Sequence, residues 1–296
     1  MIVLTTPTGQ IGRQTLARLL AADAPTPVRV VVRDPDRLPG AVRDHVEVVQ
    51  GSHGDPDVLD KAFAGAESVF WLVPSDPRAA SVDAAYSGFA RPAAEALKAH
   101  GVRHVVAVSA LGRGTPMADR AGHVTATLAM DDLLAATGVG YRALTMPSFM
   151  DNLLRQTQLI KDQGLFTLPC TGSHRAPACA TADIAAVAAE LLLDDAWGGV
   201  EEVPVLGPED LSYDDMALVM SDVLGRPVRF QQVPDAEFKA RLTGAGMSDA
   251  MAQGLVDMAR AKDAGLDNAV PRTDRTSTPT TFRQWCADVL APAVRA

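Results

Sequence analysis

Short apolar runs alternate with longer segments of helical periodicity over the first half of the chain. The apolar runs have the length and β-branched content of buried parallel strands. They fall at residues 2–4, 28–33, 45–51, 68–74, 103–112 and 140–149. Helical segments follow at residues 13–23, 55–65, 83–100 and 124–138. Strands that alternate with helices in this way imply right-handed crossovers. The pattern therefore predicts an α/β fold with a doubly wound parallel sheet, which is a Rossmann-like arrangement.

The alternation becomes less regular after about residue 150. Ser212 and Asp215 have the spacing of a capping box and predict a helix that reaches about Leu224. Thr181 is the predicted N-cap of another helix, at residues 181–195. The remaining predicted elements are a strand at 203–207, a strand at 228–233, a Met-rich helical segment at 235–264 and a last helix at 282–290.

These elements divide the chain into two parts. Residues 1–150 form the expected dinucleotide-binding domain, and we expect the segment 181–207 to return to it. Residues 151–180 and 208–296 form an expected cap, a smaller mixed α/β unit. Ligands bind beyond the carboxyl ends of the strands in such sheets. We therefore expect the cap to cover that edge and to bind the substrate.

A turn rich in threonine and glycine follows the first predicted strand directly. It contains Gly9 and Gly12 and leads into the first predicted helix. Free N–H groups at a helix N-terminus carry partial positive charge and suit a pyrophosphate. The usual dinucleotide fingerprint has three glycines, whereas this chain has Thr6 where an earlier glycine is expected. The turn thus predicts a nucleotide site with an incomplete motif.

Arg33 ends the second predicted strand, where this type of fold contacts the adenosine ribose. An arginine there accommodates the 2′-phosphate of NADP, whereas an acid accepts a hydrogen bond from the 2′-hydroxyl of NAD. Arg37 could add a second cation, and Asp34 could instead turn inward and select NAD. A solvated turn is the remaining alternative. We expect NADP(H).

Composition excludes several other classes of protein. Hydrophobic residues make up 47% of the 296 residues and charged residues 21%, which allows a large core. A net charge of -9 disfavours direct binding of nucleic acid. No apolar run approaches the ~18 residues of a membrane span, and the N-terminus lacks the basic region of a signal peptide. We therefore expect a cytoplasmic protein that binds neither nucleic acid nor a membrane.

The cysteines and histidines predict neither disulfides nor a metal site. Three scattered cysteines do not form a disulfide framework, and we interpret them as buried thiols. His100 and His104 are four residues apart, but Gly101 ends the helix that would place both on one face. We expect no metal.

Eight segments, in order, resemble the NmrA-like branch of the atypical short-chain dehydrogenases/reductases. They are TTPTGQIG, VVRDPDRL, QGSHGDPDVLDKAFAGAESVFWLVP, VVAVSALG, MPSFMDNLL, TADIAAVAAELL, LGPEDLSYDDMALVMSDVLGRPV and TPTTFRQW. The resemblance runs nearly from end to end. It implies that the pyrophosphate is held by the turn residues Thr6, Thr8, Gly9, Gln10, Ile11 and Gly12. It also implies that Arg33, with Arg37, meets the 2′-phosphate.

The same resemblance places further residues along the cofactor. It implies that Leu72, Val73 and Pro74 line it, and that Ser109 and Pro147 lie near the nicotinamide. Two departures from the family concern the turn that carries Thr6 and the position of Ser52, where relatives often have an acid.

A third departure concerns the proton donor. Catalytic members of the wider superfamily use a Tyr-xxx-Lys pair, in which the lysine lowers the pKa of the phenol that protonates the reduced carbonyl. The matching positions here are His123 and Thr127, and no tyrosine or lysine lies between Gly101 and Gly140. Either hydride transfer proceeds without this acid, or the protein performs no chemistry.

Four side chains are candidates for contact with a substrate. Ser109 could donate a hydrogen bond to a carbonyl oxygen or satisfy its own loop. His123 could act as a proton donor near its ordinary pKa or be a solvated residue. Asn152 could bind substrate or cap a helix, and Phe149 is a second candidate in that segment. Five methionines are core filler or line an apolar pocket under the cap; they are Met216, Met220, Met247, Met251 and Met258.

These observations support an NADPH-dependent reductase that acts on a ketone or quinone of a bulky, aromatic, polyketide-like substrate. The proton would come from water, from His123 or from a hydroxyl on the substrate. Some members of the family modify such compounds in antibiotic biosynthesis, including angucyclinone ketoreductases, and the resemblance extends the expectation to this chain. The alternatives are a non-enzymatic NADP(H) sensor that binds a protein partner and a general NADPH quinone reductase.

Overall fold

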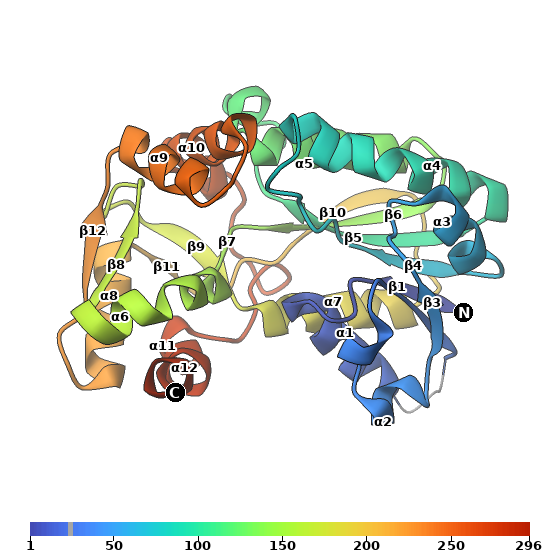
Figure 1. Cartoon of the computed structure of the whole chain (residues 1–296), viewed down its shortest axis with the longest axis horizontal. Coiled ribbons are helices and arrows are strands. Elements are labelled where there is room, and N and C mark those ends of the chain that lie inside the picture. Colours follow the sequence, from blue (N-terminus) through green and yellow to red (C-terminus); the bar gives the residue numbers. More distant parts are fainter. Residues whose placement is uncertain (23–25) are drawn as a thin grey trace.

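A sheet of seven parallel strands forms the centre of one half of the molecule (Figure 1). The computed structural model describes residues 1–22 and 26–296. The strand order is β10-β6-β5-β4-β1-β2-β3. The strands are β1 (Ile2–Thr5), β2 (Val28–Val32), β3 (Glu47–Gln50), β4 (Ser68–Trp71), β5 (His104–Ala110), β6 (Gly140–Met146) and β10 (Val200–Pro204). This order confirms the doubly wound, Rossmann-like sheet, and β10 is the predicted strand that returns to its edge.

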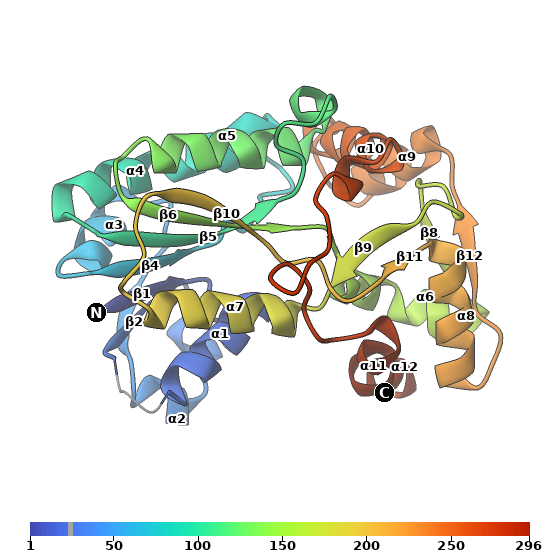
Figure 2. The same cartoon turned by 180° about the vertical axis from the view of Figure 1, so that it is seen from behind.

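Helices cover both faces of this sheet (Figures 1 and 2). On one face lie α3 (Pro56–Phe63), α4 (Phe89–His100) and α5 (His123–Ala135), and on the other lie α1 (Gln10–Leu20) and α7 (Thr181–Leu193). The short α2 (Gly40–Arg43) follows β2. The inner strands are buried on both faces and largely apolar, as in β1 and β4, whereas the edge strands β3 and β10 are exposed or half-buried.

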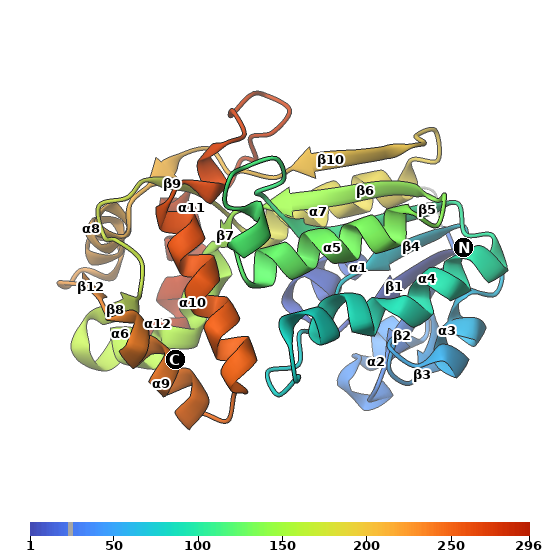
Figure 3. The same ribbon diagram turned by 90° about the horizontal axis from the view of Figure 1, so that it is seen from above.

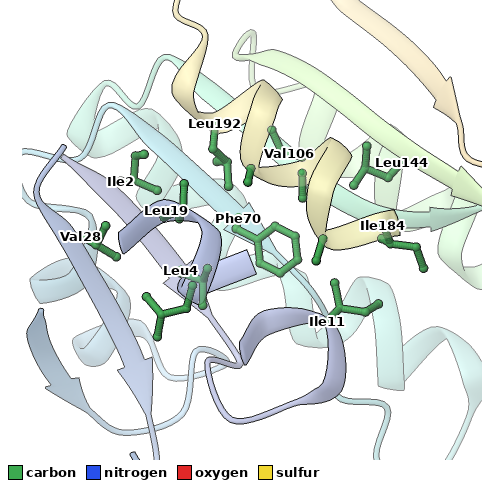
Figure 4. Packing of buried hydrophobic residues seen from close by; sticks show 14 of the residues in the cluster. Ile2, Leu4, Ile11, Leu19, Val28, Phe70, Val106, Leu144, Ile184 and Leu192 are labelled. Carbon is green, nitrogen blue, oxygen red and sulfur yellow. The ribbon is translucent and has the colours of Figure 1, made fainter. Parts of the chain in front are cut away.

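The core under α1 and α7 fixes the end of the first strand. Leu4, Phe70 and Ile184 are fully buried there and join β1, β4 and α7 (Figure 4). Burial of apolar surface contributes roughly 25 cal/mol per Å² removed from water. This packing holds the turn after β1 against the sheet edge.

The other half of the molecule is a smaller mixed α/β unit (Figure 2). Its strands are β7 (Ser148–Phe149), β9 (Ala176–Cys179) and β11 (Asp210–Leu211) in one sheet, and β8 (Leu165–Leu168) paired with β12 (Arg229–Gln232). Its helices are α6 (Thr157–Gln163), α8 (Tyr213–Leu224), α9 (Asp235–Gly244), α10 (Asp249–Asp263), α11 (Phe282–Trp285) and α12 (Ala291–Arg295). These segments have their own core, which includes Phe166, Phe282 and Trp285. Their assignment as a substrate-binding cap stays a prediction.

Several element boundaries differ from the sequence prediction. The strand expected to reach Pro74 ends at Trp71. The helical segment 235–264 is interrupted, because residues 245–248 separate α9 from α10. The last residue expected in the first helix, Asp23, lies outside the described residues. The capping box of Ser212 and Asp215 is confirmed, with both of its hydrogen bonds present.

Thr181 is not an N-cap, which corrects the prediction. Ala180 occupies that position. The Thr181 hydroxyl instead donates to Asp151 at 2.7 Å and accepts from Gln14 of α1 at 2.9 Å. The side chain therefore connects α1 with the segment after β7, and its hydroxyl is not available to the helix end.

Three further sequence predictions concern single residues and the whole chain. Cys170, Cys179 and Cys286 are free and buried, as predicted. Nε2 of His100 contacts the Asp60 carboxylate, and Nε2 of His104 contacts the Trp197 carbonyl. The two imidazoles therefore have different partners and do not converge. Among the described residues, no helix combines the length and the apolar character that a membrane crossing needs. The cytoplasmic location stays a prediction.

Candidate functional site

The glycine turn, residues 6–12, lies where β1 passes into α1. Thr6 adopts a left-handed conformation with φ of 53°, which is an outlier for a β-branched residue and common for glycine. The Thr6 carbonyl then accepts from the Gly9 amide at 3.0 Å. A Cβ atom on Gly12 would lie 2.1 Å from this carbonyl oxygen, so only glycine fits at that position. The turn keeps the glycine-type geometry although residue 6 is threonine.

The beginning of α1 offers several hydrogen-bond donors to an anion. The Arg13 amide makes the first intrahelical bond, to Gly9, which leaves the amides of Gln10, Ile11 and Gly12 without intrahelical partners. The first turn contains no acidic residue. Within residues 1–22 and 26–296, the buried Thr6 hydroxyl has no hydrogen-bond partner either. These groups fit the pyrophosphate of a dinucleotide.

Arg33 and Arg37 follow β2 at the same edge of the sheet. Both are exposed, and in the part of the chain that the structure describes neither forms an ion pair. Asp34 does not turn inward, because its carboxylate accepts from the Asp36 amide at 3.2 Å and caps the short 3-10 helix Pro35–Arg37. Two cations and no inward carboxylate fit the 2′-phosphate of NADP.

His53, which the sequence prediction missed, supports the segment Leu72–Pro74. It lies after β3 and donates from Nε2 to the Leu72 carbonyl at 3.0 Å. Burial, with a smaller effect of the Arg33 charge, lowers the pKa of His53 to about 4, so the imidazole is neutral. Its ring meets Trp71 edge-on at 5.2 Å. Leu72 and Val73 are half-buried beside the two cores and Pro74 is exposed, which leaves this predicted cofactor-lining segment at the sheet edge.

Ser109 directs its hydroxyl into the core under α5. The hydroxyl donates to the carboxylate of Asp131, which also accepts from the Tyr141 hydroxyl at 2.6 Å. Burial raises the pKa of Asp131 to about 6, although both hydroxyls oppose that rise. The Ser109 proton is therefore engaged away from the cofactor edge. Its catalytic role and its contact with the nicotinamide stay predictions, and the structure gives its hydroxyl a competing partner.

His123 is buried at the first residue of α5 and is not a solvated residue. Its Nε2 lies 3.0 Å from the Met251 carbonyl of α10, and its Nδ1 lies 3.2 Å from the Tyr86 hydroxyl. Burial lowers the pKa of His123 below its ordinary value. The ring is thus neutral with both nitrogens engaged, so its role as a proton donor stays a prediction.

Tyr86 is a second residue that the sequence prediction missed. It belongs to a π-helical turn, Ala84–Gly88, that precedes α4. The sequence has no tyrosine between Gly101 and Gly140, but the fold brings Tyr86 from the preceding crossover against His123. Burial raises the pKa of Tyr86 more than the neighbouring Ser75 and Thr127 hydroxyls lower it. We call the group of Ser75, Tyr86, His123 and Thr127 the α5 corner.

The start of α5 is in direct backbone contact with α10 (Figure 3). A Cβ atom on Gly122 would lie 2.0 Å from the Gly254 carbonyl oxygen, and Gly122 has φ of 55°. A Cβ atom on Gly254 would lie 3.0 Å from Cδ2 of the His123 ring. The backbones of α5 and α10 therefore meet directly at Gly122 and Gly254, and the Val82 and His123 side chains pack beside Gly254.

The segment after β6 carries the remaining predicted contacts. Pro147 is buried and Phe149 of β7 is half-buried against the core under α1. Asn152 is exposed on the 3-10 helix Met150–Gln156. Met216, Met220 and Met251 are buried, which agrees with their interpretation as core residues, while Met247 and Met258 are partly exposed. That methionines line an apolar pocket stays a prediction. Substrate contacts by Phe149 and Asn152 stay predictions.

Comparison with known proteins agrees with this geometry. A family model described as NAD(P)H-binding matches residues 7–195. The (4-alkanoyl-5-oxo-2,5-dihydrofuran-3-yl)methyl phosphate reductase of Streptomyces griseus is 32% identical over 97% of both chains. The NAD(P)H azoreductase of Xenophilus azovorans is 28% identical over 87% of this chain and 86% of its own.

A solved structure confirms the fold. The NADPH-dependent quinone oxidoreductase of Escherichia coli, complexed with NADPH, superposes with a TM-score of 0.77 at 24% identity and covers 100% of this chain and 99% of its own. The chain belongs to the NAD(P)H-binding family, which confirms the NmrA-like, atypical short-chain dehydrogenase/reductase resemblance. It is an oxidoreductase whose cofactor is NADP(H), as predicted. These findings favour the reductase over the non-enzymatic sensor.

Proposed function

We propose that the protein reduces a carbonyl group, in a ketone or a quinone, on a bulky, aromatic, polyketide-like substrate without a Tyr-Lys pair. Bound NADPH supplies the hydride. In this proposal the glycine turn and Arg33 hold the dinucleotide, and Phe149 and Asn152 contact the substrate. The fold thus contributes proximity and orientation.

The composition of the α5 corner carries this proposal. His123 and Thr127 stand at the positions of the Tyr-Lys pair, and the corner contains no lysine or arginine. None of these four residues supplies a cation to stabilise a phenolate, and burial raises the pKa of Tyr86, which favours the protonated phenol. Such a site suits an electron-poor acceptor, because the oxyanion of a reduced quinone or hydroxylated aromatic ketone is delocalised or internally hydrogen-bonded and needs less help from a general acid than a simple alkoxide does.

The names of the relatives support the same class of acceptor. One relative is named as a reductase of a phosphorylated oxo-dihydrofuran and another as an azoreductase. The structural neighbour is named as a quinone oxidoreductase. Conjugated acceptors are common to these names, and the polyketide-like substrate rests on the family resemblance alone.

The experiment follows oxidation of NADPH with naphthoquinones, hydroxylated aromatic ketones and saturated aliphatic ketones of similar size. We expect turnover with the first two groups, none with the third, and a preference for NADPH over NADH. Turnover confined to aliphatic ketones would contradict the proposal. Equal rates with every quinone tested, including the smallest, would favour the general quinone reductase.

A further inference from the structure

The helix α7 begins without a cap from its own N-cap residue. That residue is Ala180, whose side chain cannot accept a hydrogen bond. The Asp151 carboxylate, from the segment after β7, takes its place. One of its oxygens accepts from the Thr181 amide at 3.0 Å and the other from the Thr181 hydroxyl at 2.7 Å. A negative charge is favourable at the start of a helix, and the use of both oxygens fixes the orientation of the carboxylate on α7.

The Thr181 hydroxyl continues this contact to α1. The Gln10 carbonyl can only accept, so the NH2 group of the Gln14 side chain is the donor to it, at 2.9 Å. The second N–H of that group donates to the Thr181 hydroxyl at 2.9 Å. The single hydroxyl proton of Thr181 is already on Asp151. A chain of hydrogen bonds with one direction therefore runs from α1 through Thr181 to Asp151.

This chain starts from a rigid and buried part of the molecule. The helices α1 and α7 pack against each other, with Ile11, Leu19 and Ile184 in one core (Figure 4). Thr181 is only 3% exposed. A buried polar group that loses its partner is costly, and a buried network whose groups are all paired is rigid. The start of α7 is thus a firm point of attachment beside the glycine turn.

Asp151 belongs to the 3-10 helix Met150–Gln156, which has seven residues. Runs of this helix longer than four residues are uncommon, because their hydrogen bonds are poorly aligned. Contacts outside the helix therefore have to hold it. Met150 and Leu153 attach it to the core of the C-terminal half, and Asp151 attaches it to α7. The same helix carries the exposed Asn152, a predicted substrate contact.

We propose that Thr181 and Asp151 are positioning residues that set the place of the 3-10 helix Met150–Gln156 relative to α1 and the glycine turn. They act through hydrogen bonds between the two halves and touch neither cofactor nor substrate. The kinetic consequence rests on the proposed function, since it requires that Asn152 contacts the substrate. A displacement of about 1 Å can then cost on the order of a hundredfold in rate.

Thr181→Val tests the chain at its centre, because valine has nearly the same shape and lacks the hydroxyl. Amide hydrogen exchange of residues 150–156 is followed by mass spectrometry in the presence of NADP+. One net hydrogen bond corresponds to about tenfold in an opening equilibrium, so these amides should exchange about tenfold faster than in the wild type. Calorimetry should show NADP+ affinity within about twofold of the wild type, because Thr181 is not part of the glycine turn.

Two further variants separate positioning from general damage to the fold. Thr181→Ser restores the hydroxyl, and its exchange over residues 150–156 should lie within about twofold of the wild type. Thr15→Val removes a fully buried hydroxyl of α1 that donates to the Ile11 carbonyl of the same helix at 3.1 Å. It should leave the exchange of residues 150–156 unchanged.

Steady-state rates with NADPH and a naphthoquinone give the second readout. We expect Thr181→Val to lower kcat about tenfold and Thr181→Ser to restore it. Unchanged exchange of residues 150–156 in Thr181→Val, or the same acceleration in Thr181→Ser or Thr15→Val, would overturn the inference even if quinones are reduced. Faster exchange in Thr181→Val alone, in a protein whose wild type turns over no quinone or ketone, would uphold the positioning of this helix and contradict the proposed function.

Discussion

The glycine turn and the α5 corner lie on the same edge of the sheet but are built in different ways. The glycine turn uses backbone groups within seven consecutive residues, 6–12, and its geometry depends on the space that Gly12 leaves. The α5 corner uses side chains from three separate parts of the chain, held by hydrogen bonds and by α10. The first is proposed to bind the part of the cofactor that is common to many enzymes, whereas the second is proposed to face the substrate, which differs among them.

The largest effect is expected from breaking the glycine turn. Gly12→Ala places a Cβ 2.1 Å from the Thr6 carbonyl oxygen, and α1 must move away from β1 to relieve the overlap. We expect NADPH binding to weaken on the order of a thousandfold, which is about 4 kcal/mol, as measured by calorimetry. Gly244→Ala is the matched control, because a Cβ atom there would meet no other atom within 4 Å. Similar affinities in the two variants would show that the overlap is not decisive.

The core under the α5 corner should respond to pH. The pKa of Asp131 is raised from 3.8 to about 6 in the folded protein, so the folded state holds this proton more tightly than the unfolded state does. The resulting stability is present below about pH 4, is lost as the pH rises through about 6 and does not change further above about pH 7. Its size is about 3 kcal/mol.

Asp131→Asn should remove this dependence because an amide does not ionise. We therefore expect the free energy of unfolding of the wild type, relative to Asp131→Asn, to fall by about 3 kcal/mol between about pH 3 and 7 in denaturant titrations. Asp132→Asn is the control, since that carboxylate is exposed and pairs with Arg113 at the surface. A difference that stays constant over this range would contradict the buried-carboxyl explanation.

Arg33→Ala tests the choice between the two dinucleotides. Loss of a charge-assisted contact with the 2′-phosphate is worth about 2 kcal/mol, so NADPH should bind about thirtyfold more weakly while NADH binding stays the same. Arg18→Ala removes an exposed arginine from the far end of α1 and should change neither. An equal loss of affinity for both dinucleotides would show that Arg33 supports the fold and does not contact the 2′-phosphate.

The smallest effect is expected at Thr6. Thr6→Gly relieves the left-handed conformation and should raise the free energy of unfolding by about 1 kcal/mol. It also removes the buried hydroxyl that has no partner among the described residues. If that hydroxyl donates to the pyrophosphate, calorimetry will show NADPH affinity falling by about fivefold. A stabilised variant with unchanged affinity would limit Thr6 to a conformational role.

The sequence predicted the sheet well because parallel strands that are buried on both faces leave continuous apolar runs, such as Val28–Val32. It predicted the glycine turn because that site is local. It did not predict the roles of Tyr86 and His53, because their hydrogen-bond partners come from other crossovers and the neighbouring residues in the sequence do not indicate them. Thr181 was wrongly predicted to be an N-cap, because a local pattern cannot show that Asp151 and Gln14 both hydrogen-bond to its hydroxyl. The burial of Asp131 was also not predicted, because an acid within a predicted helix resembles an ordinary surface residue.

The contact of Gly122 with Gly254 makes position 122 intolerant of any side chain. A residue other than glycine there would place its Cβ 2.0 Å from the Gly254 carbonyl oxygen and would have to adopt a φ of 55°. The close approach of α10 to α5, and with it the contact of the Met251 carbonyl with His123, therefore depends on glycine at this position.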